Sequence, residues 1–322
     1  MSVSSAKRGL HVATLSGWYR FEYDGIQWRQ LNRDLTYWTL TCLSVDPQDP
    51  EIIYAGTEHS GLFYTKTGGA RWLRADPNVP KMMLYAALAF DGGVLVGTIP
   101  SAVYRRKNGG WQELEGVRQN SAAAKFPPSP ELQSRTRYLT FDPASPKRLY
   151  AGIEVGGLLV SDDGGDHWEP ANEGLTDADV HEILASEKNP GIVFAACGEA
   201  TFRSLDRAAH WEEITPESHD YGMSIAEDSD GTVYLGSAKG RPNAWIRKRG
   251  ADAAIFRSRD LGAHWDIVVG GLKGGVMHMC ATPDGHGVIA GTSDGTLLAI
   301  DDLGARTLVS GLPCITSVEL GA

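Results

Sequence analysis

Residues 161–168 (SDDGGDHW) return in altered form as residues 258–265 (SRDLGAHW). The two stretches share the pattern Ser-x-Asp-x-Gly-x-x-Trp. Seven copies of one pattern predict a fold built from repeated structural units. The looser copies end at Trp211, Trp72, Trp111 and Trp28, and a last copy at residues 302–304 lacks the tryptophan.

Each residue type in the pattern suits a tight turn between two strands. Serine and aspartate side chains can accept hydrogen bonds from backbone N–H groups of the turn, and glycine tolerates a positive φ angle. The tryptophan is large enough to fill the space between neighbouring sheets. We therefore expect the pattern, including His167, His210 and His264, to hold turns together and to take no part in chemistry.

Short apolar segments surround the pattern and repeat with it. Such runs, separated by Gly, Pro or Asp, predict consecutive antiparallel strands. Together with the strand after the turn they make a four-stranded unit, which is one blade of a β-propeller. The segments at residues 43–47, 53–57 and 61–64 have counterparts at residues 139–143, 149–152 and 157–160.

The repeat resembles the Asp-box (BNR) repeat of sialidases, sortilin-like receptors and photosystem assembly factors. The resemblance implies an all-β propeller, and counting the repeats predicts seven blades in a single domain, residues 1–322. The seventh blade would combine residues 10–31 with residues 315–320, so that pairing of the two chain ends closes the ring and covers its last sheet edges. The other six blades are expected at residues 36–75, 81–116, 134–172, 178–215, 220–269 and 275–311.

The composition of the 322-residue chain is that of a globular protein. Hydrophobic residues make up 42% and charged residues 22%, which excludes wholesale disorder. A net charge of −10 argues against a nucleic-acid partner, and no apolar run is long enough to cross a membrane. Four widely separated cysteines and the lack of a secretory leader predict a cytoplasmic protein.

The face opposite the repeated turns is the expected binding face, because its loops can vary on a rigid frame. Two insertions fall on this face, at residues 117–134 and 239–253, and they could form a collar over the central channel. The inner strands are expected to start on the same face. Residues at those starts should therefore line the mouth of the channel.

Four histidines map to this face. His59 and His219 lie in loops, whereas His181 and His278 lie at the starts of inner strands. Neutral imidazole suits Zn, Fe, Mn, Cu or Ni, and three ligands with one open position are typical of a catalytic metal. We therefore expect a divalent transition metal held by these histidines, with a structural hydrogen bond as the alternative role for each one.

Carboxylates, arginines and aromatic residues are expected around that metal, with solvated loops or ion pairs between blades as their alternative roles. A carboxylate could act as general base, and a tyrosine as acid or nucleophile. The catalytic candidates are Glu58, Glu154, Glu199 and Tyr221. The side chains expected to bind the substrate are Arg135, Arg137, Trp38, Tyr85 and Arg241.

The sequence hypothesis is a metal-assisted hydrolase or lyase that acts on a small polar or anionic molecule at the top of the channel. No Gly-x-Gly-x-x-Gly motif opens a helix, so no nucleotide cofactor is expected. A non-catalytic propeller that binds a protein or peptide is the alternative. A sialidase-like glycosidase is disfavoured, because the Arg-Ile-Pro motif of sialidases is absent. The oligomeric state is left open.

Overall fold

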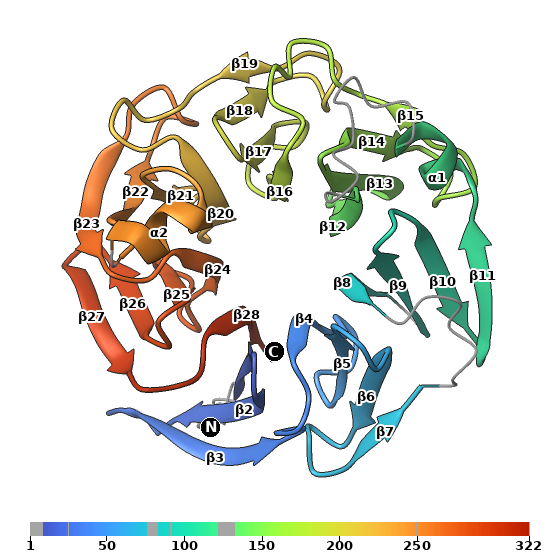
Figure 1. The fold of residues 1–322 in the computed structure, drawn as a ribbon, viewed down its shortest axis with the longest axis horizontal. Coiled ribbons are helices and arrows are strands. Elements are labelled where there is room, and N and C mark those ends of the chain that lie inside the picture. Colours follow the sequence, from blue (N-terminus) through green and yellow to red (C-terminus); the bar gives the residue numbers. More distant parts are fainter. Residues whose placement is uncertain are drawn as a thin grey trace, which may run out of the picture.

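The computed structural model describes residues 9–24, 26–75, 83–90, 92–121, 133–248 and 250–321. In these residues, seven four-stranded antiparallel sheets stand around a central channel (Figure 1). The predicted seven-bladed β-propeller is therefore confirmed. The described residues also contain two short helices, α1 (Gly116–Ser121) and α2 (Pro242–Lys248). Neither of them has the length and apolar character that crossing a membrane requires.

The blades are numbered 1–7 in ring order, and the strands of each are named from the channel outward. Blade 1 contains β28 (Ile315–Leu320), β1 (Gly9–Thr14), β2 (Gly17–Tyr23) and β3 (Trp28–Asp34). Blade 2 contains β4 (Leu40–Val45), β5 (Ile52–Thr57), β6 (Leu62–Lys66) and β7 (Trp72–Arg74). Blade 3 contains β8 (Leu84–Phe90), β9 (Gly93–Thr98), β10 (Val103–Lys107) and β11 (Gly110–Leu114).

Blades 4 to 7 follow the same order. Blade 4 contains β12 (Arg135–Asp142), β13 (Ser145–Glu154), β14 (Gly157–Ser161) and β15 (Glu169–Pro170). Blade 5 contains β16 (Val180–Ala185), β17 (Val193–Cys197), β18 (Thr201–Ser204) and β19 (Glu212–Glu213). Blade 6 contains β20 (Tyr221–Glu227), β21 (Val233–Ala238), β22 (Ala253–Ser258) and β23 (Asp266–Leu272). Blade 7 contains β24 (Val276–Ala281), β25 (Val288–Thr292), β26 (Leu297–Asp301) and β27 (Gly304–Val309).

Blade 1 closes the ring with both ends of the chain. The C-terminal strand β28 pairs antiparallel with β1, so that Leu10 stands opposite Leu320 and Val12 opposite Val318. Leu10, Val12 and Val318 are fully buried. The predicted composite blade is confirmed, and the first and last repeats share one sheet.

The repeated turn is a hydrogen-bonded unit, as the sequence pattern predicts. In the copy that joins β14 to β15, Ser161 Oγ donates to Asp163 Oδ1 at 2.9 Å and accepts from the Gly165 N–H at 2.8 Å. Asp163 Oδ1 also accepts from the backbone N–H of His167 at 2.9 Å. The indole of the buried Trp168 donates to the Gly165 carbonyl at 2.9 Å. The copies at residues 204–211 and 258–265 repeat the serine bonds.

Neighbouring blades approach closely because a glycine stands in the second strand where the inner strand of the next blade crosses it. A Cβ placed on Gly236 would lie 2.6 Å from the Cβ of Val276. Blade 5 reverses the arrangement: Ala196 stands in its second strand and Gly222 in the inner strand of blade 6. One of the two facing positions therefore lacks a side chain. The other glycines of this kind are Gly56, Gly97, Gly152 and Gly291.

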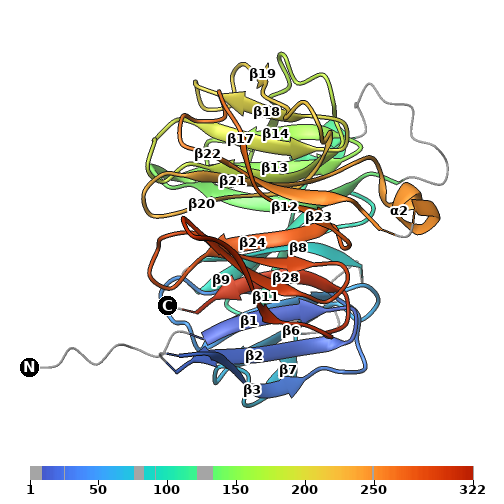
Figure 2. The same ribbon diagram turned by 90° about the vertical axis from the view of Figure 1, so that its left-hand side faces the viewer.

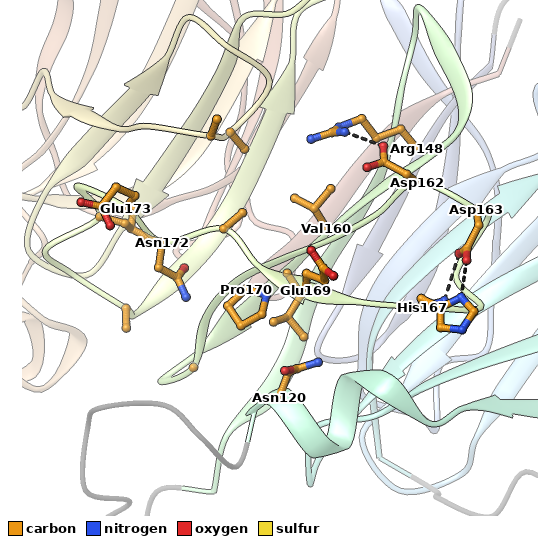
Figure 3. Close-up of a pocket in the computed structure, with 17 residues that line it drawn as sticks. Asn120, Arg148, Val160, Asp162, Asp163, His167, Glu169, Pro170, Asn172 and Glu173 are labelled. Carbon is orange, nitrogen blue, oxygen red and sulfur yellow. Dashed lines mark hydrogen bonds and ion pairs between the residues drawn. The ribbon is translucent and has the colours of Figure 1, made fainter.

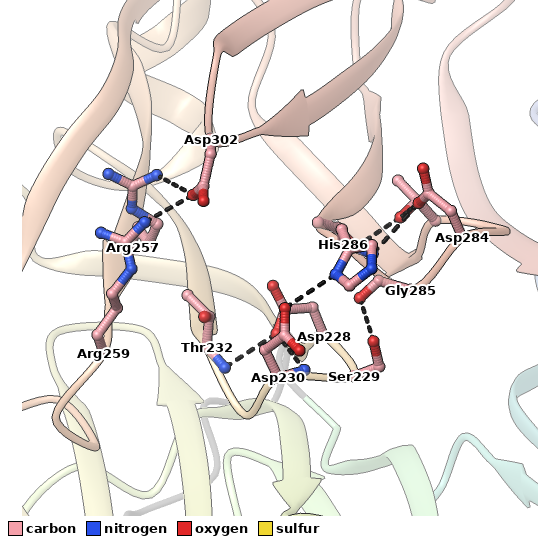
Figure 4. Close-up of polar contacts among 12 residues, drawn as sticks. Asp228, Ser229, Asp230, Thr232, Arg257, Arg259, Asp284, Gly285, His286 and Asp302 are labelled. Atoms are coloured by element: carbon pink, nitrogen blue, oxygen red, sulfur yellow. Dashed lines mark hydrogen bonds and ion pairs between the residues drawn. The ribbon is translucent and has the colours of Figure 1, made fainter.

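Polar contacts between turns join blades 6 and 7 as well (Figure 4). His286 Nδ1 lies 2.9 Å from Asp230 Oδ2. Asp302 Oδ1 accepts hydrogen bonds from Arg257 at 3.0 Å and from Arg259 at 2.6 Å. Exposed ion pairs contribute about 0–1 kcal/mol each, so the close packing at the glycines contributes more to the joint.

The face on which the inner strands begin is called the top face below. The predicted insertion at residues 239–253 contains α2, which projects from the body of the propeller (Figure 2). Trp245 of α2 packs edge-on against Tyr221, with ring centroids 5.9 Å apart. Of the other predicted insertion, residues 117–134, the part at 122–132 lies outside the described residues.

Replacement of Gly236 by alanine should destabilise the protein by about 1–3 kcal/mol, because the added methyl group overlaps Val276 in a packed interface. Denaturant unfolding followed by tryptophan fluorescence measures the change. Gly110→Ala is the matched control, since the nearest atom to its Cβ would be the Lys107 carbonyl oxygen at 3.7 Å. Equal stability of the two variants would contradict the argument from close approach.

Candidate functional site at the mouth of the channel

Every inner strand has a β-bulge near its start, and the bulges form a ring at the top of the channel. The pairing of the inner strand with the second strand slips by one residue at the same place in all seven blades. A bulge inserts one extra residue and redirects its side chain. The seven extra residues all line a cavity of about 300 Å³ in the channel. They are Thr41, Tyr85, Arg137, His181, Met223, Met277 and Thr316.

Some bulged side chains also fasten their blade to the next one. Thr41 Oγ1 donates to the Leu84 carbonyl at 2.5 Å, and Thr316 makes the equivalent bond to blade 2. His181 Nδ1 lies 2.6 Å from the Gly222 carbonyl oxygen. This contact makes Nδ1 the protonated ring nitrogen and leaves Nε2 as an acceptor that faces the channel.

Two arginines and a glutamate form an arginine clamp at the mouth. Glu154, the last residue of β13, accepts hydrogen bonds from Arg135 Nη2 and from Arg137 Nη1, the latter at 2.7 Å. Burial alone would raise the pKa of Glu154, but the two guanidinium groups outweigh it and lower the pKa to about 2. Arg135 also lies over the Tyr85 ring, 5.0 Å from its centroid. Glu154 is therefore a carboxylate at every physiological pH.

Asp179 lies beside this clamp, and its pKa is shifted in the opposite direction to that of Glu154. Burial, reinforced by the charge of Glu154, raises the pKa of Asp179 to about 6. Its buried Oδ1 has no hydrogen-bond partner among the described residues and lies 3.7 Å from His181 Nε2. The Tyr221 hydroxyl lies 3.4 Å from the same nitrogen. Burial lowers the pKa of His181 to about 4, so that its ring is neutral at pH 7.

Glu154, Asp179 and His181 are the one group of three metal-type ligands, within the described ranges, whose donor atoms lie within 4.8 Å of one another. Their surroundings work against a cation. Both oxygens of Glu154 are bonded to arginines, and two guanidinium groups at the same place repel a positive ion. The donor set therefore fits a metal poorly, and the chemistry of this site is better assigned to the side chains themselves.

The four histidines that were expected to hold a metal are not brought together. His59 lies on a loop, and its side chain is 71% exposed. The two ring nitrogens of His219 lie 2.8 Å from a serine hydroxyl and 2.9 Å from a backbone carbonyl oxygen. His181 and His278 do line the channel, on blades 5 and 7. The two loop histidines, His59 and His219, do not line this cavity.

The other residues predicted for the site divide between the rim and the mouth. Glu199 and Arg241 form an exposed ion pair at 2.7 Å, which ties the insertion at residues 239–253 to blade 5. Trp38 packs against Phe63, with ring centroids 4.9 Å apart, and Glu58 lines the cavity wall. The remaining five lie at the mouth. Arg135, Arg137 and Glu154 form the arginine clamp, Tyr85 lies against Arg135, and Tyr221 contacts His181.

Sequence reasoning missed Asp179 and three residues deeper in the channel, which are Tyr138, Glu182 and Glu319. The three deeper residues line the cavity. Burial raises the pKa of Glu182 well above its usual range and that of Glu319 to about 8. The signal that could have found them is their fixed offset from the start of an inner strand, because Tyr138 and Glu182 directly follow bulged residues.

A larger hollow, of about 700 Å³, lies along β14 and β15 of blade 4 (Figure 3). Its wall includes Glu169, Pro170 and Asn172. Strand β15 has two residues, so it covers little of the outer edge of β14. The His167–Asp163 pair in this wall belongs to the repeated turn, which leaves the channel mouth as the stronger candidate for chemistry.

Comparison with known proteins shows a shared fold. Neither a protein family nor a curated protein matches the chain. The GH74 xyloglucanase from Xanthomonas campestris is 18% identical with a TM-score of 0.70, and the match covers 92% of this chain and 50% of that one. The GH74 enzyme from Niastella koreensis is 14% identical with a TM-score of 0.68, with 98% and 52% covered.

A third solved structure, YCF48 bound to D1 peptide, is 12% identical with a TM-score of 0.58, and the match covers 98% of this chain and 96% of that one. This chain therefore spans about half the length of the two GH74 enzymes and nearly all of YCF48. At these identities the likeness concerns the propeller architecture, which both glycoside hydrolases and a peptide-binding protein share.

Glu319 should make stability depend on pH between about 6.5 and 8. The pKa of its carboxyl is about 8 in the folded chain, against an ordinary value of 4.5 for glutamate, so in this window the folded state holds a proton that the unfolded state has lost. The free energy of unfolding therefore falls as pH rises. Glu319→Gln should remove about 1–2 kcal/mol of this fall, measured by denaturant unfolding at two pH values.

Glu169→Gln, on the exposed strand β15, is the matched control and should keep the slope of the unmodified protein. The channel histidines act below this window. Because burial lowers the pKa of His181 and of His278 to about 4, the contribution of these two histidines to stability falls as pH drops from 6.5 toward 4. An unchanged slope in Glu319→Gln would mean that the Glu319 carboxyl is solvated in the channel.

Proposed function

We propose that the channel mouth is the active site of a hydrolase or lyase, which acts on a small polar molecule by proton transfer at Asp179. The observation that carries the proposal is the pair Glu154 and Asp179, whose carboxylate oxygens lie within 4.8 Å of each other although their pKa values are about 2 and about 6. Titratable groups whose pKa values are pushed apart within a cleft are typical of acid–base sites.

Asp179 has the protonation equilibrium that such chemistry needs. A pKa of about 6 lets it accept a proton near neutral pH and return the proton in a later step. Its unpaired Oδ1 faces His181 Nε2, and the Tyr221 hydroxyl lies near the same nitrogen. The contact of His181 Nδ1 with the Gly222 carbonyl keeps Nε2 free to take part. These three side chains supply the proton path of the proposal.

The arginine clamp has a binding role in this proposal. Glu154 neutralises one of the two charges of Arg135 and Arg137, so the clamp keeps one net positive charge. Guanidinium groups held in this way favour a substrate with a carboxylate or another anionic group. The propeller fold shared with GH74 enzymes is compatible with a hydrolase, and the repeated Ser-Asp-Gly-Trp turns support a place among the Asp-box propellers.

Asp179→Asn should lower kcat by about 100- to 10,000-fold on any substrate that the protein turns over, because the amide cannot exchange a proton. A panel of chromogenic esters, glycosides and phosphates is the assay, and kcat/KM should change with pH around 6. Asp266→Asn, at the exposed start of β23, is the control. Unchanged turnover in Asp179→Asn would contradict the proposal.

Elemental analysis by mass spectrometry separates this proposal from a metal-assisted mechanism. The tag-free protein should contain no stoichiometric transition metal, and its activity should persist after dialysis against EDTA. About one metal per chain, lost in His181→Ala, would contradict metal-independent chemistry. It would instead favour Glu154, Asp179 and His181 as the ligands.

A peptide-binding scaffold is the second candidate, favoured by the hollow along β14 and β15 (Figure 3). YCF48, which shares the architecture, is described as bound to D1 peptide. Selection from a random peptide library tests this candidate. Ala209→Arg puts a bulky side chain in the wall of the hollow and should abolish capture, whereas Asp179→Asn should not. Capture that both variants retain would argue against this surface.

A further inference from the structure

Below the mouth, side chains from blades 1, 5 and 7 turn acceptor atoms into the channel. The Glu182 side chain is 4% exposed, and its Oε1 lies 3.8 Å from His278 Nε2, beyond hydrogen-bond distance. His278 Nδ1 lies 3.0 Å from the Val318 carbonyl oxygen, so Nδ1 carries the proton and Nε2 is an acceptor. Glu319, from the C-terminal strand, faces the same cavity.

The two carboxyl groups have no cation beside them to balance their charge. No lysine or arginine in the described parts of the chain forms an ion pair with Glu182 or Glu319, and Glu319 makes no hydrogen bond there. Two neutral groups, the Ser224 hydroxyl and the Ile225 backbone N–H, lower the pKa of Glu182, and so does the charge of Arg137. The Arg137 guanidinium, however, is bonded to Glu154 at the mouth. Burial without a neighbouring cation disfavours the ionised form of a carboxyl group, so a positively charged ligand would stabilise the carboxylate form of both residues.

The spacing of the acceptors favours an organic cation over a single metal ion. Counted from the bulge in its own strand, Glu319 lies two residues deeper than Glu182, an offset of about 6–7 Å along the strand direction. Among the described residues, the donor atoms of these two carboxyl groups and His278 do not all lie within 4.8 Å of one another. One ion at the usual ligand distance of about 2 Å cannot reach all three. Two ammonium groups on a flexible chain can each meet one carboxylate.

The rest of the lining suits the carbon chain of such a ligand. The Tyr138 ring, whose centroid lies 6.4 Å from that of the His278 ring, offers an aromatic face to a cation. Met223 and Met277 line the same cavity and supply an adaptable apolar wall. The whole cavity, from Arg137 and His181 at the mouth to the two deeper carboxyl groups, has a volume of about 300 Å³. This volume is at the lower end for ligand pockets, which restricts the occupant to a small molecule.

We propose that the chamber formed by Tyr138, Glu182, His278 and Glu319 binds a small aliphatic diamine, with one ammonium group at Glu182 and the other at Glu319. None of these four residues belongs to the acid–base group at the mouth. The diamine site therefore stands whether or not Asp179 is catalytic.

Isothermal titration calorimetry of the full chain with 1,4-diaminobutane at pH 7 tests the proposal. About one diamine per chain is expected to bind. Glu182→Gln and Glu319→Gln should each weaken binding about tenfold or more, because each removes a charge-assisted hydrogen bond. n-Butylamine, which has one ammonium group, should bind about tenfold more weakly than the diamine for the same reason. Circular dichroism checks that each variant keeps its β structure.

Glu169→Gln and Asp179→Asn are the controls, and both should bind the diamine as the unmodified protein does. Loss of binding in Asp179→Asn would place the diamine at the mouth and overturn the proposal. No binding in the millimolar range, or equal binding in Glu319→Gln, would also overturn it. Binding of MnCl2 in place of the diamine, lost in Glu182→Gln, would mean a metal site instead. If Glu182→Gln does not fold, Glu319→Gln and n-butylamine still decide.

Discussion

This propeller depends on one constraint, which is how closely two neighbouring blades can pack against each other near the channel. Seven sheets converge on one channel, and the inner strand of each crosses the second strand of the blade before it. At six of the seven joints, one of the two residues that meet at this crossing is a glycine, as Gly236 opposite Val276 shows. Blade 5 obeys the same limit with the roles exchanged, since Ala196 faces Gly222. Because β28 pairs with β1, the closed ring has no free end at which a wider joint could be absorbed.

The same convergence builds the candidate site. A bulge near the start of each inner strand directs an extra side chain toward the axis, so that residues far apart in the chain share one small cavity. Some of these side chains serve the frame, as Thr41 does through its bond to the Leu84 carbonyl. His181 does both, because one ring nitrogen contacts the next blade and the other faces Asp179 and Tyr221.

The channel divides into two zones of different charge balance. At the mouth, two arginines hold Glu154 ionised, and its negative charge in turn helps to keep the nearby Asp179 partly protonated. Farther in, no lysine or arginine in the described part of the chain pairs with Glu319, and burial raises its pKa. Three carboxyl groups in one channel thus have three different pKa values. The difference depends on whether a guanidinium group, a carboxylate or no charged group lies beside each of them. That contrast is the physical basis for assigning proton transfer to the mouth and cation binding to the chamber below.

The sequence by itself determined the repeat, the number of blades and the composite first blade, because the bonds of each turn and its tryptophan lie within eight residues, as at 161–168. It also placed Arg137, Glu154 and His181 on the correct face, since inner strands start at a constant point in each repeat. Only the tertiary structure decided which of these side chains meet, and it left His59 and His219 away from the axis. Asp179 and Glu319 look ordinary in the sequence. Their protonation is set by burial and by charges from other blades, and those depend on contacts that no local pattern encodes.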